Sequence, residues 1–276
     1  MKIVHSETAR RRGGSPHRPD GIGFICLFSG DERSPDNYWL ALGTTVDYST
    51  PRHRHNFDQV RIMVSGEFDF GRGYLLDAGK IGYFCEGSFY EQHSVGKAEA
   101  LVLQMGGASG SGYMSLDEVY AGSARLAQRG SFKDGVFTSN AGDARKVNQD
   151  GYEAVWEDVH QRPITYPKPR YMGPVVMDPE AFQWLPLDGA EGVFERHFGT
   201  FHERGAAISQ IMVEPGRTCS TVSEPSVTLY FIFDGSGSLE GQSIKKHSAV
   251  QLDKGEVVSF TAESRLHIQR FRLPAF

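Results

Sequence analysis

Short runs of alternating apolar and polar residues, each closed by turn residues, recur along the chain and predict β-strands. Typical runs are residues 59–66, 101–105 and 228–235, which are rich in β-branched and aromatic side chains. Many strands of this length, separated by glycine-containing turns, are typical of β-sandwiches and β-barrels. The pattern therefore predicts an all-β protein.

One segment has the signature of a helix instead. Ser115 is followed three residues later by Glu118, which is the spacing of a capping box. Apolar residues then recur with a helical period until Gly130, a residue type that often ends helices. We expect one helix here, packed outside the first set of strands.

The chain divides by composition into three parts. Residues 1–130 hold the first strand patterns, a basic arm at 10–12 and the helix. Residues 131–175 are polar and rich in proline, so we expect an irregular connector there. Residues 176–276 return to the strand pattern, and a length of 276 residues suits two domains of ordinary size.

Charge and cysteine content exclude several classes of function. The 29 Lys and Arg residues and 34 Asp and Glu residues give a net charge of −5, so the basic field of a general nucleic-acid binder is missing. The apolar runs are too short to cross a bilayer, and no apolar core follows the basic arm, so we expect neither a membrane partner nor a signal peptide. The three cysteines are widely spaced, which favours a reducing, cytoplasmic location.

The strongest chemical signal is a pair of histidines. His53 and His55 are spaced i, i+2, so they face one side of a strand, with Gln59 and Arg61 in the same parity. In a small barrel this side is the lumen, and two imidazoles beside an amide suit a divalent metal. The alternative is a metal-free pocket in which the histidines act as hydrogen-bonding or acid–base groups.

The spacing around these histidines resembles the first motif of the cupins, a family of small jelly-roll barrels. That motif is G-x5-H-x-H-x3-E-x6-G, and it maps in order onto Asp47, His53, His55, Gln59 and Gly66. The frame agrees, but an aspartate stands at the opening glycine and Gln59 replaces the ligand glutamate.

The second cupin motif, G-x5-P-x-G-x2-H-x3-N, is also present in outline. It maps in order onto Gly79, Cys85, Gly87, Tyr90 and Ser94. Tyr90 stands where the family has its third ligand histidine. It could ligate as a phenolate, but we expect it to donate a hydrogen bond to the substrate, because a phenol with a pKa near 10 is usually neutral.

The same frame recurs in the second half without a histidine at any ligand position. The first motif maps onto Gly216, Val222, Glu224, Thr228 and Gly235, and the second maps more loosely onto Gly255, Thr261, Glu263 and Leu266. The chain therefore resembles a bicupin, with two cupin-type jelly-roll β-barrels of which the second lacks metal ligands. The resemblance also implies a homodimer.

The resemblance implies a metal-dependent enzyme, first of all a dioxygenase or other oxygenase, that acts on a small organic substrate. His53 and His55 would hold the metal, and Gln59 and His93 would complete the site, with His93 turned inward by a bulge or else facing water. Iron(II) is the expected metal, with nickel, manganese or zinc as alternatives. Tyr90 and Arg61 are the candidate catalytic residues, which would orient an oxygen or a carboxylate of the substrate.

Two questions stay open at this level. A buried Arg61 guanidinium must meet either a protein carboxylate or an anionic ligand. The function could also be that of a metal-dependent or metal-free isomerase or lyase, or of a non-catalytic cupin that binds a small molecule. No glycine-rich nucleotide fingerprint lies between a strand and a helix, so we expect no nucleotide cofactor.

Overall fold

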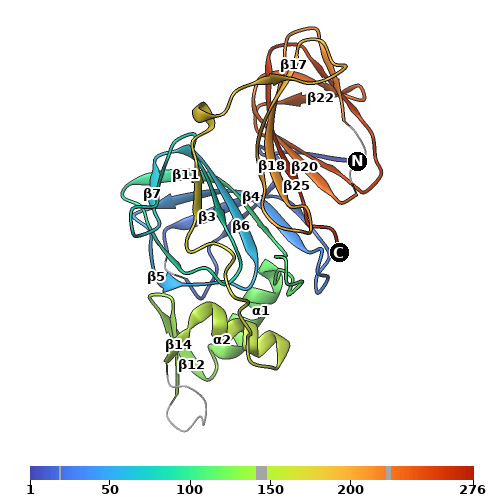
Figure 1. Ribbon diagram of the computed structural model, residues 1–276. Helices are drawn as coiled ribbons and strands as arrows, with labels where there is room; N and C mark the ends of the chain where they lie inside the picture. The colour runs from blue at the N-terminus through green and yellow to red at the C-terminus, as the bar shows by residue number, and fades with distance from the viewer. Residues whose placement is uncertain (19, 141–147, 222–224) are drawn as a thin grey trace. The chain divides into compact units, whose positions relative to one another are not determined.

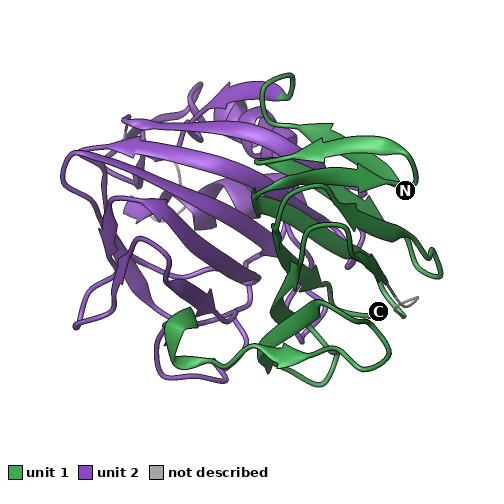
Figure 2. Ribbon diagram, turned by 90° about the horizontal axis from the view of Figure 1, so that it is seen from above, with its two compact units in different colours: residues 1–9, 178–276 green, residues 10–177 purple. Residues whose placement is uncertain are grey.

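A computed structural model describes residues 1–18, 20–140, 148–221 and 225–276. Strands account for 48% of the described residues, and the all-β prediction is confirmed. The chain forms two compact units, one of residues 10–177 and one of residues 1–9 together with 178–276 (Figure 2). In the described ranges, no helix combines the length and the apolar character that a bilayer span requires.

The unit of residues 10–177 contains two antiparallel sheets that enclose its core (Figure 1). The larger sheet has seven strands, in the order β15 (Val175–Met177), β9 (Ile81–Phe84), β6 (Asp58–Ser65), β11 (Lys97–Met105), β4 (Tyr38–Val46), β3 (Ile22–Ser29) and β2 (Arg10–Gly13). The smaller sheet has four, in the order β5 (Ser49–His53), β10 (Tyr90–His93), β7 (Glu67–Asp69) and β8 (Leu75–Asp77).

Aromatic side chains from both sheets fill one end of this core. Phe84 of β9 lies between Phe70 and Tyr90, with ring centroids 4.7 Å and 4.9 Å away. Phe68 of the smaller sheet and Met63 of the larger one belong to the same buried cluster. Alternation along β6 thus turns one row of side chains into the space between the sheets, as period-2 geometry requires.

The predicted helix exists as α1 (Leu116–Leu126), and its capping box is present as expected. The Ser115 hydroxyl accepts from the Glu118 backbone N–H at 3.1 Å, and the Glu118 carboxylate accepts from the Ser115 N–H at 3.0 Å. The helix ends earlier than predicted, because Ala127 is its C-cap and Gly130 already begins a strand. Its start was therefore better specified than its end.

The expectation of an irregular connector is wrong for much of residues 131–175. They contain the helix α2 (Gly151–His160), and residues 130–150 supply a three-stranded sheet of β12 (Gly130–Lys133), β13 (Val136–Ser139) and β14 (Asn148–Asp150). Asp150 caps α2 by accepting from the Tyr152 and Glu153 N–H groups. These elements gather with α1 at one end of the unit, next to β5 (Figure 1).

The unit of residues 1–9 and 178–276 repeats this architecture after a short 3₁₀ helix, η1 (Pro179–Ala181). Its larger sheet has the order β1 (Lys2–His5), β23 (Ser248–Leu252), β20 (Thr228–Asp234), β25 (Leu266–Arg272), β18 (Ala207–Val213), β17 (Val193–Thr200) and β16 (Leu185–Pro186). Its smaller sheet has the order β19 (Thr218–Ser220), β24 (Ser259–Ala262), β21 (Ser236–Leu239) and β22 (Gln242–Lys245).

The larger and the smaller sheets of the two units match in strand order, which makes β6 the counterpart of β20 and β9 the counterpart of β23. Gly66 ends β6 and Gly235 ends β20, both with positive φ. A Cβ at either position would collide with a backbone carbonyl, at 2.6 Å from Lys97 O or 2.1 Å from Arg265 O. The repeated first motif therefore marks the same tight turn in both units.

The looser second match needs a correction. Gly255 follows β23 as Gly87 follows β9, and both have positive φ, so Gly255 corresponds to Gly87 and not to Gly79. The residue in the place of Tyr90 is then Val258. Val222 and Glu224 lie outside the described residues.

Candidate active site

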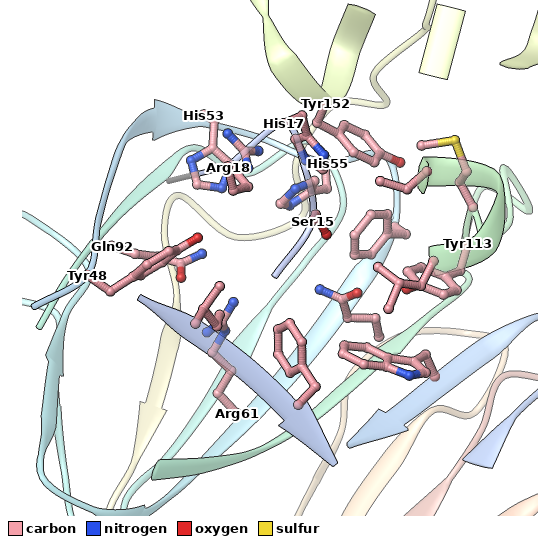
Figure 3. A pocket seen from close by; sticks show the side chains of 18 residues that line it. Ser15, His17, Arg18, Tyr48, His53, His55, Arg61, Gln92, Tyr113 and Tyr152 are labelled. Carbon is pink, nitrogen blue, oxygen red and sulfur yellow. The ribbon is translucent and has the colours of Figure 1, made fainter. Parts of the chain in front are cut away.

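A cavity of about 80 Å³ lies inside the unit of residues 10–177 (Figure 3). Its walls come from the smaller sheet, the larger sheet, the arm before β3, and both helices. Among the described residues that line it there is no aspartate or glutamate. The polar side chains of the wall are those of Ser15, His17, Arg18, Tyr48, His53, His55, Arg61, Gln92, Gln104, Tyr113 and Tyr152.

His53 presents an unprotonated nitrogen to this cavity. It is the last residue of β5 and is 3% exposed. Its Nδ1 lies 2.7 Å from the Pro51 carbonyl oxygen, so Nδ1 carries the proton and donates it. Its Nε2 is buried without a hydrogen-bond partner. Burial lowers the pKa of His53 well below its usual value, and the charge of Arg18 lowers it further.

His55 sits just beyond β5 in a fixed orientation. Its carbonyl oxygen accepts from the Gly87 N–H at 2.8 Å. Its Nδ1 lies 2.9 Å from the Tyr90 hydroxyl and 3.1 Å from Gln59 Nε2. Burial, followed by the neighbouring His53, lowers the pKa of His55 well below its usual value. The ring is therefore a neutral imidazole held from one side by a phenol and an amide.

Gln59 and Tyr90 support His55 and do not line the cavity. Gln59 Nε2 donates to the Tyr90 hydroxyl, and Gln59 Oε1 accepts from Gln104 Nε2 at 3.0 Å. Tyr90 is 3% exposed, and burial raises the pKa of its hydroxyl. In this structure the Tyr90 hydroxyl contacts His55 Nδ1, and its predicted contact with substrate stays a prediction.

Arg61 is a buried cation that no protein carboxylate neutralises within the described part of the chain. The residue is 7% exposed, and its Nε has no hydrogen-bond partner. Burial lowers the pKa of its guanidinium, an effect that Tyr90 and Tyr48 partly oppose. The guanidinium lies 5.6 Å from the ring centroid of Phe70 and 5.9 Å from that of Phe68. Of the two alternatives open at the sequence level, a protein carboxylate is thus not the one found.

The arm before β3 contributes two wall residues that the sequence pattern did not indicate. His17 is 5% exposed, and its Nδ1 has no hydrogen-bond partner. Arg18 Nη1 lies 3.3 Å from Asp150 Oδ2, while Arg18 Nη2 is buried without a partner. No periodic signal could have found them, because the arm is irregular and only the fold brings it to the histidine pair.

Helix α2 also reaches the site through its first turn. The Tyr152 ring stands edge-on to the His55 ring at 4.6 Å between centroids, and its hydroxyl donates to Asn56 Oδ1 at 2.7 Å. The segment that was expected to be a connector is therefore part of the cavity wall.

His93 does not join the site. It is exposed, whereas Tyr90 and Gln92 of the same strand are buried. A register irregularity does fall between Tyr90 and Gln92, but strand alternation afterwards turns His93 outward. The sequence could not separate a bulge that turns His93 inward from one that does not.

The donor set fits a divalent metal only in part. His53 and His55 can each supply one imidazole, and the unpartnered His53 Nε2 suits a ligand. However, no three His, Cys, Asp or Glu side chains of the described residues are arranged to hold a metal ion. Arg18 and Arg61 add positive charge to the same cavity, which opposes a dication. The described side chains therefore do not complete a metal site by themselves.

The unit of residues 1–9 and 178–276 has the same motif spacing but lacks the histidine pair and the buried arginine. Thr228 and Tyr230 precede Gly235 by the same numbers of residues as Gln59 and Arg61 precede Gly66. Tyr230 and Val258 belong to a buried apolar cluster that fills the space between the two sheets of this unit. A unit with the same motif spacing thus folds with an apolar cluster around Tyr230 and Val258.

No protein-family model matches the sequence, and no curated protein matches it either. Solved structures do match along nearly the whole chain. A proposed dioxygenase from Nostoc punctiforme is 10% identical, with a TM-score of 0.66 over 99% of this chain and 82% of that one. A bacterial pirin from Escherichia coli, in complex with nickel(II), is 8% identical, with a TM-score of 0.56 over 100% of this chain and 99% of that one.

An oxalate decarboxylase from Bacillus subtilis is 11% identical, with a TM-score of 0.58 over 99% of this chain and 76% of that one. Such low identities establish a shared fold and leave the activity undetermined. With the matched strand orders and the repeated motif frame, they show that the chain has the two-barrel fold of the cupins.

Proposed function

We propose that the first barrel is the active site of an enzyme that acts on a small organic anion. The observation that carries this proposal is the buried Arg61 guanidinium. Among the described residues it has no carboxylate partner, and those that line its cavity include no aspartate or glutamate. A buried charge is costly unless it is paired, and a carboxylate of the substrate would supply the missing partner.

Comparison with the second barrel supports the proposal that Arg61 is buried for function and not for the fold. Its frame accommodates Tyr230 at the place of Arg61 and Val258 at the place of Tyr90, within an apolar interior. The fold itself therefore does not require a buried guanidinium or a buried phenol–imidazole pair. Local departures from what stabilises a fold are expected at functional sites.

Proton transfer is the chemistry that the described side chains support best. The His53 Nδ1–H is held by the Pro51 carbonyl, which leaves the Nε2 lone pair directed at the cavity. A substrate carboxylate on Arg61 would place its neighbouring carbon near an imidazole that can accept a proton. The reaction class is then that of an isomerase or lyase, with His53 as the base and Tyr90 positioning His55.

Ligand binding tests the anion proposal. Small carboxylates should bind the purified protein in isothermal titration calorimetry, and Arg61→Met should weaken binding by at least about thirtyfold, because a buried charge pair loses one partner. Arg11→Met changes an exposed arginine of β2. It is the matched control and should bind like the parent. Equal affinity of the parent and the Arg61→Met variant would contradict the proposal.

His53 is tested separately from binding. His53→Gln should keep carboxylate affinity within about threefold and remove turnover, because the amide cannot act as a base. His93→Gln changes an exposed histidine of the same sheet and should be neutral. Full turnover of His53→Gln would remove His53 from the mechanism.

A metal-dependent oxygenase is the second candidate, and the unpartnered Nε2 of His53 is the observation that favours it. His53 and His55 would hold the ion, which would act as a Lewis acid, and substrate oxygens would fill other positions. Iron(II) stays the expected metal, with nickel, manganese or zinc as alternatives. Elemental analysis decides: about one equivalent in the parent and none in a His53→Ala, His55→Ala variant supports the oxygenase, and no metal under any loading condition supports the metal-free reaction.

A further inference from the structure

A second arginine lines the cavity. The inference drawn from it concerns the substrate class and rests on the proposed function. The Arg18 side chain is 8% exposed and lines the same cavity as Arg61. Its Nη2 is buried and has no hydrogen-bond partner among the described residues, as is the case for the Nε of Arg61. Two buried guanidiniums with free donors therefore line one cavity, whose described lining residues include no aspartate or glutamate.

The two guanidiniums lie on different sides of this cavity. Figure 3 shows Arg18 next to His53 and His17, whereas Arg61 approaches from the opposite side, beyond Tyr48 and Gln92. Both arginines line this cavity together with His53, His55 and Tyr48. A ligand in that space would meet a cation at each end.

Asp150 explains why Arg18 is held in place yet still has a donor to offer. The Asp150 carboxylate meets Arg18 Nη1 through Oδ2, while its Oδ1 accepts from the first turn of α2. This carboxylate is shared between a helix cap and one nitrogen of the guanidinium. The other terminal nitrogen of Arg18 keeps its hydrogen-bonding capacity for the cavity, and an Arg fork of this kind suits a carboxylate.

We propose that the substrate is a small dicarboxylate, with one carboxylate bound by Arg61 and the other by Arg18. A monocarboxylate satisfies one guanidinium and leaves the buried donor of the other unpaired. A dicarboxylate satisfies both, and the volume of about 80 Å³ restricts it to a short carbon chain. Arg18 is then a specificity-determining residue that reads the second carboxylate.

Matched pairs of acids isolate the contribution of the second carboxylate. The probes are malonate with propionate, and succinate with butyrate, titrated calorimetrically into the full chain. The parent should bind each diacid more tightly than its monoacid. Arg18→Met should weaken the better diacid about tenfold, as expected for a charge-assisted hydrogen bond, and leave its monoacid within about twofold. Arg11→Met, at an exposed position of β2, controls for the loss of one positive charge.

A second variant tests the inference independently in case Arg18→Met does not fold. Asp150→Asn keeps an oxygen for capping α2 but removes the negative charge that competes for Arg18. It should therefore raise the ratio of diacid to monoacid affinity. A ratio that stays at the parent value in both Arg18→Met and Asp150→Asn overturns the inference. Failure of all four acids to bind the parent instead overturns the proposed function, so the two failures are distinguishable.

Discussion

At the scale of single residues, the buried polar groups of the first barrel lower its free energy of unfolding, and the second barrel has apolar packing at the corresponding positions. Arg61 and Tyr90 occupy positions where the second barrel has Tyr230 and Val258. A buried charge loses its hydration, and the only partners that the described residues offer Arg61 are aromatic rings and a phenol. The first barrel therefore gives up stability at the point where it can bind a ligand.

Arg61→Met follows directly from this argument. The change replaces an unpaired buried cation by an apolar side chain of similar length, so the free energy of unfolding should rise by about 1–3 kcal/mol. The measurement is urea unfolding without ligand. The gain should vanish when a tight-binding carboxylate is present, because only the parent is then stabilised by ligand. A fall in stability without ligand would mean that Arg61 has a structural partner.

Gln59→Glu tests the metal prediction at the residue that departs from the family pattern. Gln59 lies behind His55 and outside the cavity wall, so a carboxylate there would meet the Tyr90 hydroxyl and His55 Nδ1 first. If a dication sits between His53 and His55, the added negative charge should still raise metal affinity clearly. Competition with a chelator measures it. Equal affinity in both forms would mean that Gln59 is not a ligand.

The sequence indicated those site residues that share a strand parity and missed those that do not. His53, His55 and Arg61 all line the cavity, whereas Gln59, which has the same parity, does not, and their roles stay predictions. His17 and Arg18 come from an irregular arm whose position depends on long-range packing against α2, which leaves no periodic trace in the sequence. The inward orientation considered for His93 is not found, because a sequence can suggest a bulge but not the direction in which it turns a side chain.

At the scale of elements, glycine positions were more informative than apolar patterns. The spacing of Gly66 and Gly235 identified the same turn in both units, and Asp47 has the positive φ, 46°, that its place in the motif requires. The sequence pattern does not predict helix α2, although Tyr152, Val155 and Trp156 have helical spacing, because the prolines that follow it favour irregular structure. Packing against α1 and the histidine segment supplies what local propensity did not.

Substituting the frame glycines should show how strongly these turns are specified. Gly66→Ala and Gly235→Ala combine a positive φ with a Cβ that would contact backbone carbonyl oxygens, so each should lower the free energy of unfolding by about 3 kcal/mol or more. Gly79→Ala is the control, because its φ is +90° but nothing lies within 4 Å of its Cβ. It should cost only about 1–2 kcal/mol. Equal costs at all three positions would mean that φ alone decides.

At the scale of the whole molecule, each larger sheet ends in a strand that is distant in sequence from the strand it pairs with. The outermost strand β1 comes from the N-terminus and pairs with β23, whereas β15 pairs with β9 after the chain has passed through α2. Stability of the second unit thus depends on the first residues of the chain, and composition alone could not reveal this. The two cores nevertheless differ around the motif positions, where one has the apolar cluster of Tyr230 and Val258 and the other has Arg61 and the histidine pair.

Those ionisable groups make the stability of the protein depend on pH in a defined direction. Burial lowers the pKa values of His17, His53 and His55 well below the ordinary value. The unfolded chain takes up these protons near pH 6.5, whereas the folded chain does so only at lower pH. Stability from these residues is therefore fully present above pH 6.5 and decreases as the pH falls below it, by up to about 1.4 kcal/mol per pH unit for each histidine.

Urea unfolding between pH 7.5 and pH 5 measures this slope. His17→Asn removes one of the three imidazoles without touching the His53–His55 pair, so the decrease in the free energy of unfolding should become shallower by about 1 kcal/mol per pH unit. His93→Asn alters an exposed imidazole and should keep the parent slope. An unchanged slope in His17→Asn would mean that His17 takes up its proton within the folded state, with water admitted to the cavity, and the closed polar interior described for the first barrel would not persist in solution.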